Sequence, residues 1–135
     1  MRVRVVTKHG SELPTGVLNE NWNLTSETTF PLTVGEEYAV HALTAVGDVF
    51  WYYVLDDHDL GYPVWYPAPL FAITDDTIPS WWAINYIPNT ARPNATGTSI
   101  ISFKEWATDK SFYERLVDGD AEAAEVFRRE RNKFN

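Results

Sequence analysis

The sequence predicts a single α+β domain over residues 1–135. Its β-rich part covers residues 1–101, with the strands within residues 2–101, and its helical part covers residues 102–135. Two observations support this prediction. Short apolar runs separated by turn residues fill the first part, which is typical of a small antiparallel sheet or barrel. After residue 101, a helix-capping pattern and apolar residues at helical spacing predict two C-terminal helices.

The beginning of the chain is expected to hold one strand and a long loop. Alternating apolar residues predict a strand within residues 2–8. Residues 9–33 are rich in Gly, Ser, Thr, Asn and Pro, which predicts a loop with at most a short strand near residues 17–18. A loop of this length is unusual in a compact domain, so we expect Trp22 and Phe30 to hold it against the core.

A β-hairpin is predicted at the centre of the chain. Residues 36–44 alternate between two faces, and β-branched and aromatic residues fill residues 49–55. A short link containing Gly47 separates the two runs, as in a tight hairpin. Further short strands are expected over residues 64–66, 70–74, 81–87 and 99–101, which together indicate a small antiparallel barrel or a strongly bent sheet.

The aromatic pairs within these strands allow a prediction about burial. Adjacent residues of a strand point to opposite faces, so one of Trp81 and Trp82 should be buried and the other exposed. The same expectation holds for Trp51 and Tyr52. The strand pattern does not decide which of Trp81 and Trp82 is buried. For the binding site we choose Trp82 as the exposed member and Trp81 as the core residue.

The pair Trp81-Trp82 ahead of Asn85-Tyr86 resembles the SH3 family, in which a tryptophan pair and a later Pro-x-Asn-Tyr line a peptide groove. The order departs from that family, because Pro88 follows the tyrosine here. No residue role is carried over from the resemblance. It implies an SH3-like barrel as one form of the β-rich part, and peptide binding as one function.

The helical part begins with a capping box, in which Ser102 is the expected N-cap and Glu105 occupies the third helical position. Gly119 is a suitable stop for this first helix. Asp120 then caps a second helix over residues 121–133, with acids near its start and bases near its end, as the helix dipole favours.

Negative charge is concentrated in one segment of this protein, whose net charge is −8. Between His9 and Ala91 there is no Lys or Arg, whereas acids and bases balance after residue 91. We call the 11 acids of that segment the acid block: Glu12, Glu20, Glu27, Glu36, Glu37, Asp48, Asp56, Asp57, Asp59, Asp75 and Asp76. The block argues against direct binding to nucleic acid or to an anionic membrane, and it permits a basic protein partner.

The chain carries no recognisable catalytic, metal or phosphate-binding motif. It has no Cys, and its seven glycines are scattered. His58 stands among three aspartates, but neighbouring residues rarely converge on one metal ion, so a solvated loop is the favoured interpretation. No cofactor is predicted. Whether the protein is an enzyme stays open, and the absence of a catalytic motif favours a protein that is not an enzyme. A carboxylate-dependent hydrolase or a sugar-binding domain using Asp48, Asp75 or Asp76 beside aromatic rings remains an alternative.

The predicted location is the cytoplasm. The first residues lack the apolar run of a signal peptide, and no apolar stretch is long enough to span a membrane.

Two functions follow from the acid block and the aromatic residues within it. The first is an inhibitor or immunity-type protein that covers a basic surface of a partner protein such as a nuclease. The second is an SH3-like recognition module for basic or proline-rich peptides. For either function, the expected binding residues are acids in turns and the aromatic residues near them: Tyr53, Asp56, Asp57, Asp59, Tyr62, Trp65, Asp75, Asp76 and Trp82.

Overall fold

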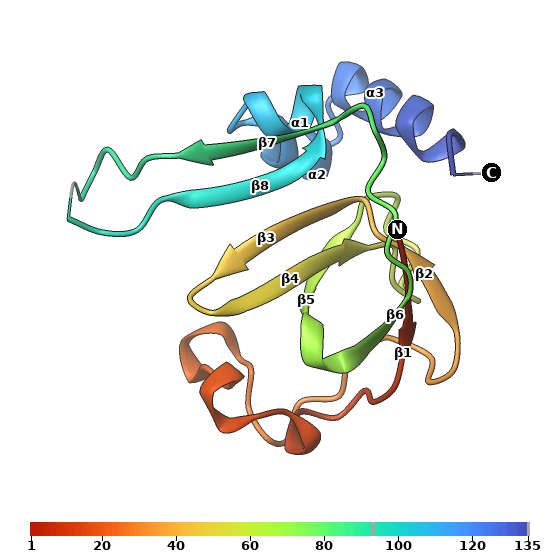
Figure 1. Cartoon of the computed structure of the whole chain (residues 1–135), viewed down its shortest axis with the longest axis vertical. Helices are drawn as coiled ribbons and strands as arrows, with labels where there is room; N and C mark the ends of the chain where they lie inside the picture. Colours follow the sequence, from red (N-terminus) through yellow and green to blue (C-terminus); the bar gives the residue numbers. More distant parts are fainter. Residues whose placement is uncertain (93, 135) are drawn as a thin grey trace.

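The computed structural model describes residues 1–92 and 94–134, and over these residues it shows two antiparallel sheets followed by three α-helices (Figure 1). The predicted α+β class and the order of its two parts are confirmed. The sheets do not close into a barrel, so the open-sheet form of the prediction applies.

The smaller sheet has three strands in the order β2-β1-β6. Their bounds are β1 (Arg2–Val5), β2 (Glu37–Ala39) and β6 (Phe71–Asp75). Val3 and Val5 are fully buried, which explains why the alternating start of the chain forms the central strand of this sheet.

The larger sheet has five strands in the order β5-β4-β3-β8-β7. Their bounds are β3 (Ala42–Val46), β4 (Val49–Val54), β5 (Val64–Pro67), β7 (Trp82–Ile87) and β8 (Thr98–Phe103). The predicted hairpin is present as β3–β4, and Gly47 in its turn has a φ of 62°, a conformation that glycine adopts without strain.

The single strand predicted over residues 36–44 is divided between the two sheets. β2 ends at Ala39, and β3 begins at Ala42. Between them the Val40 amide donates to the Met1 carbonyl, while the His41 amide donates to the Tyr53 carbonyl. The chain therefore leaves one sheet and enters the other at this bend, with Val40 completely buried in the corner.

Residues 9–33 form three 3-10 turns, over Gly10–Glu12, Thr15–Val17 and Glu20–Trp22. Phe30 is buried, as expected. Trp22 is 47% exposed, but one side of its ring lies against other tryptophans.

Two apolar clusters hold the protein together. The first lies between the two sheets and the N-terminal loop, and the second lies between the five-stranded sheet and the helices. Trp82 packs against both clusters. The helices thus cover only part of one face of the larger sheet (Figure 1).

The helical part holds α1 (Lys104–Thr108), α2 (Phe112–Val117) and α3 (Ala121–Asn132). The first predicted helix is thus two short ones, because Asp109 adopts an extended conformation and its carboxylate accepts hydrogen bonds from Ser111. The predicted capping box is also wrong: Ser102 belongs to β8, and its buried hydroxyl donates to the His41 carbonyl at 2.6 Å.

The predicted cap of the last helix is confirmed. The side chain of Asp120 accepts a hydrogen bond from the Ala123 amide at 2.9 Å. Within the described ranges, no helix combines the length and apolar character needed to cross a membrane.

Candidate functional site

A row of aromatic rings crosses one face of the five-stranded sheet. Tyr53 and Trp65 are directly opposite each other on β4 and β5, and Trp51 lies two residues before Tyr53 on the same face. The ring centroids of Trp51 and Trp65 are 4.6 Å apart, and those of Tyr53 and Trp65 are 6.3 Å apart. Trp22 extends the row from the N-terminal loop, 5.8 Å from Trp51 and 5.6 Å from Trp65.

One end of this aromatic row is part of the core. The ring centroid of Tyr53 lies 4.8 Å from that of Trp106 and 5.1 Å from that of Tyr113. Burial raises the pKa of Tyr53 to about 12, and it also raises the pKa of Tyr113, whose hydroxyl donates to the Pro63 carbonyl. These phenols are therefore neutral at physiological pH.

The other end of the row opens to solvent around Trp22. A hollow of about 410 Å³ lies between Trp22, Tyr53, Trp65 and residues 96–98, where the β7–β8 loop enters β8. A second hollow, of about 200 Å³, lies on the side of Trp22 that faces Leu24 and Phe30. Trp22 therefore stands between open hollows.

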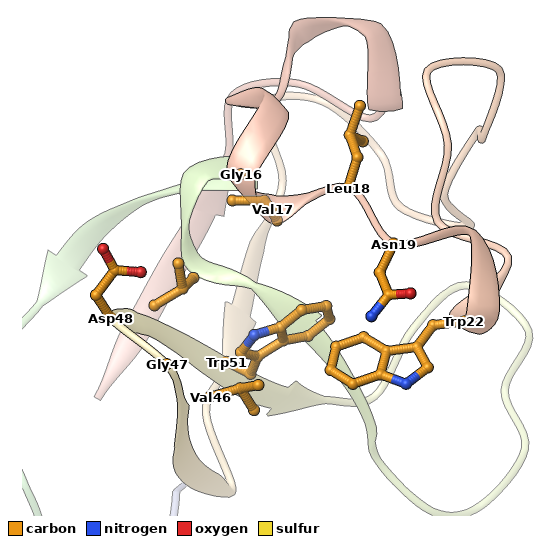
Figure 2. A pocket seen from close by; sticks show the side chains of 10 residues that line it. Gly16, Val17, Leu18, Asn19, Trp22, Val46, Gly47, Asp48 and Trp51 are labelled. Carbon is orange, nitrogen blue, oxygen red and sulfur yellow. The ribbon is translucent and has the colours of Figure 1, made fainter.

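A third hollow, of about 220 Å³, adds polar groups to this aromatic end (Figure 2). Its apolar lining includes Val17, Val46 and the rings of Trp22 and Trp51, which lie side by side in the figure. Asp48, in the β3–β4 turn, also lines it. We call Trp22, Trp51, Trp65, Asp48 and these three hollows the Trp22 site.

The predicted binding residues do not form one cluster. Tyr53 and Trp65 belong to the aromatic row, and both line the hollow of about 410 Å³, although Tyr53 also packs against the helices. Tyr62 is partly buried and packs against the helical cluster. Asp59 is exposed in the β4–β5 loop, where its φ is 53°.

Asp56 and Asp57 are engaged within the protein. Asp56 is buried and accepts hydrogen bonds from the Tyr66 hydroxyl and the His58 amide. Asp57 is exposed, and its two oxygens accept from the hydroxyls of Thr33 and Tyr38, both at 2.6 Å. These contacts give both carboxylates a structural role, and their role in binding stays a prediction.

Asp75 and Asp76 line a separate hollow on the three-stranded sheet, with Ile73 and Thr74. The backbone and side chain of Thr77 donate to Asp75 and hold the pKa of its carboxyl below its ordinary value. Two parts of the predicted site are thus on different sheets.

The two tryptophan predictions differ in outcome. Trp81 and Trp82 do differ in exposure, but the assignment is reversed: Trp82 is partly buried, and Trp81 is 45% exposed. Trp51 and Tyr52 are both 6% exposed, so the expected contrast between them is absent. The reason is that both faces of β4 are covered, one by the smaller sheet and the other by the loop carrying Trp22.

The ion pairs of the described residues lie in the helical part and do not include the acid block. All six ion pairs of the described residues lie between residues 105 and 133, in the helical part. No member of the acid block takes part in them. Over residues 1–92 and 94–134, no group of three or more His, Cys, Asp or Glu side chains is arranged to hold a metal ion.

Sequence reasoning did not include Trp22 among the binding residues, although it lies between Asn21 and Asn23, in a polar setting unusual for a core tryptophan. Comparisons with protein-family models, with curated proteins and with solved structures found no match.

Proposed function

We propose that this protein binds a basic surface of a partner protein, as an inhibitor or immunity-type protein does, and that the Trp22 site supplies its aromatic anchors. The observation that supports this most directly is the 47% exposure of Trp22 beside three hollows. Tryptophan is enriched among the residues that dominate binding energy, especially where neighbouring groups exclude water.

The packing of Trp22 favours binding. Its ring is already held against Trp51 and Trp65, so little side-chain freedom remains to be lost when a partner covers its exposed side. Asp48 lines one of the hollows at these rings, and Glu20 is two residues before Trp22 in the same 3-10 turn. A Lys or Arg of the partner would gain both a cation–π contact and charge attraction there.

A nuclease is a suitable partner class because it must present Lys and Arg to its phosphate substrate. The acid block, which forms no ion pairs among the described residues, would attract such a surface and accelerate encounter. The cytoplasm is the proposed setting.

A recognition module for basic or proline-rich peptides is the second candidate. The 410 Å³ hollow between Trp22 and Trp65 favours it, because aromatic grooves dock extended proline-rich segments. Such binding would be weak and would be reproduced by a short synthetic peptide, whereas a folded basic partner would be needed for the first function.

The test compares two tryptophans of similar exposure, Trp22 and Trp81. A partner is first isolated with the full chain from its native host and identified by mass spectrometry. Trp22→Ala should then weaken its binding by roughly 30-fold or more, the loss typical of an interface hot spot. Trp81→Ala, which changes a tryptophan outside the Trp22 site, should leave affinity nearly unchanged. Equal affinities of the two variants, or a partner without a basic surface, would contradict the proposal.

A further inference from the structure

A hollow at the other side of the molecule combines positive groups in a protein that is acidic as a whole. It has a volume of about 380 Å³ and lies between the smaller sheet and the end of α3. Arg2 comes from β1, Glu37 and Tyr38 come from β2, and Arg131 comes from α3. In Figure 1 the end of α3 and the start of β1 lie on the same side of the molecule.

His41 is the most deeply buried polar residue of this hollow, at 3% exposure. Its ring lies 5.1 Å from those of Phe127 and Phe134, which accounts for its packing as a core residue. Those contacts do not satisfy the ring nitrogens, which form no hydrogen bond to any residue that the structure describes.

His41 is nevertheless one of the residues that line the hollow, together with Arg2 and Arg131. A ligand in the hollow would therefore lie next to His41. A group bound there would meet a polar ring that has no other described partner.

The guanidinium groups of Arg2 and Arg131 are also available for a ligand. Neither takes part in the six ion pairs of the described residues. Burial is the main cause that lowers the pKa of His41. The positive charges of Arg131 and of the Met1 amino group lower it further. A bound negative group would offset this repulsion.

We propose that this hollow binds the carboxylate group of a small molecule, held by Arg2 and Arg131 with His41 as its most buried polar contact. Guanidinium groups suit a planar carboxylate, which can accept two parallel hydrogen bonds. Glu37 also lines the hollow and would repel a dianion, which favours a singly charged carboxylate over phosphate. Leu55 and Phe134 provide an apolar surface for the rest of the ligand, and the volume suits a small organic molecule.

Benzoate is a suitable probe, because it joins one carboxylate to an apolar ring. The full chain is titrated with benzoate while the ring signals of His41 are followed by NMR at constant pH and ionic strength. We expect saturable changes at His41, and the titration of its ring should move to higher pH with benzoate bound, because the carboxylate stabilises the imidazolium.

The control variants lie on the same helix. Arg131→Gln should weaken benzoate binding by roughly tenfold or more, the loss expected for a charge-assisted hydrogen bond. Arg128→Gln removes a guanidinium that is 64% exposed and paired with Glu125, and benzoate affinity should stay within about twofold of the original. The amide spectrum of each variant verifies that it remains folded.

Three results would overturn the proposal. The first is the absence of any response of His41 to benzoate at ~10 mM, a concentration that reveals a millimolar site. The second is an equal loss of affinity in both variants. The third is tighter binding of inorganic phosphate than of benzoate, which would exclude a carboxylate as the preferred group. This test does not involve Trp22 or a protein partner, so its outcome is independent of the proposed function.

Discussion

The Tyr66 hydroxyl donates a 2.5 Å hydrogen bond to Oδ2 of Asp56, and both residues are buried. The ring of Tyr66 also meets that of Phe30 edge-on at 5.8 Å. Burial, followed by the bond to Asp56, raises the pKa of the Tyr66 phenol well above its ordinary value. This pair joins β5, the loop after β4 and the N-terminal segment.

Tyr66→Phe should therefore lower the free energy of unfolding by about 1–3 kcal/mol, because it leaves Oδ2 of the buried Asp56 carboxylate without its donor. Urea denaturation followed by fluorescence provides the measurement. Asp59→Asn, at an exposed position three residues beyond Asp56, is the matched control and should have little effect. Equal unfolding free energies for Tyr66→Phe and the original chain would show that the bond contributes nothing.

His41 predicts a specific dependence of stability on pH. Burial, then the charges of Arg131 and the N-terminus, lowers its pKa from 6.5 to about 3. Between these values the unfolded chain binds a proton that the folded protein does not, so stability falls as pH decreases from about 6.5 towards 3.

At pH 4, the lowered pKa of His41 should reduce the free energy of unfolding by about 3 kcal/mol. This reduction is measured by comparing the original chain with His41→Gln in urea at pH 7 and pH 4. The variant should lose less stability than the original between the two pH values, because only the original carries the histidine. Parallel pH profiles would mean that His41 titrates normally in the folded protein.

Trp82 and Trp81 should differ in their effect on folding. Trp82 packs against both apolar clusters, so Trp82→Ala should cost about 3 kcal/mol of stability by creating a cavity. Trp81 is 45% exposed, and its Nε1 donates to Glu130 while Lys133 lies over its ring. Trp81→Ala should cost only about 1 kcal/mol. Thermal unfolding of both variants decides the order, and a larger loss for Trp81→Ala would contradict the packing described above.

The acid block predicts that partner binding depends on salt. Raising the salt concentration from ~0.02 to ~0.5 M shortens the Debye length several-fold and screens the attraction between exposed charges. The association rate constant, measured by stopped-flow fluorescence with the identified partner, should fall by at least roughly tenfold. A rate that does not change would limit the acid block to a role in solubility.

Features that depend on neighbouring residues were predictable from the sequence. The β3–β4 hairpin follows from two strand-forming runs around Gly47, and the start of α3 follows from the capping side chain of Asp120. The order of a β-rich part before a helical part was predictable for the same reason, since strand and helix periodicities are local patterns.

Features that depend on distant segments required the tertiary structure. The bend at residues 40–41 exists because each half of one apparent strand finds a different partner, Met1 in one sheet and Tyr53 in the other. Ser102 remains in β8 because its hydroxyl donates a hydrogen bond to the His41 carbonyl. Ser102 is therefore not available to cap α1. The acids of one sequence segment lie on different sheets, and Trp22 lies against Trp51 and Trp65 from a loop far away in the chain. The sequence shows where the acidic and aromatic residues lie along the chain. Long-range strand pairing, and the segments that cover each face of β4, decide which of these residues reach one surface.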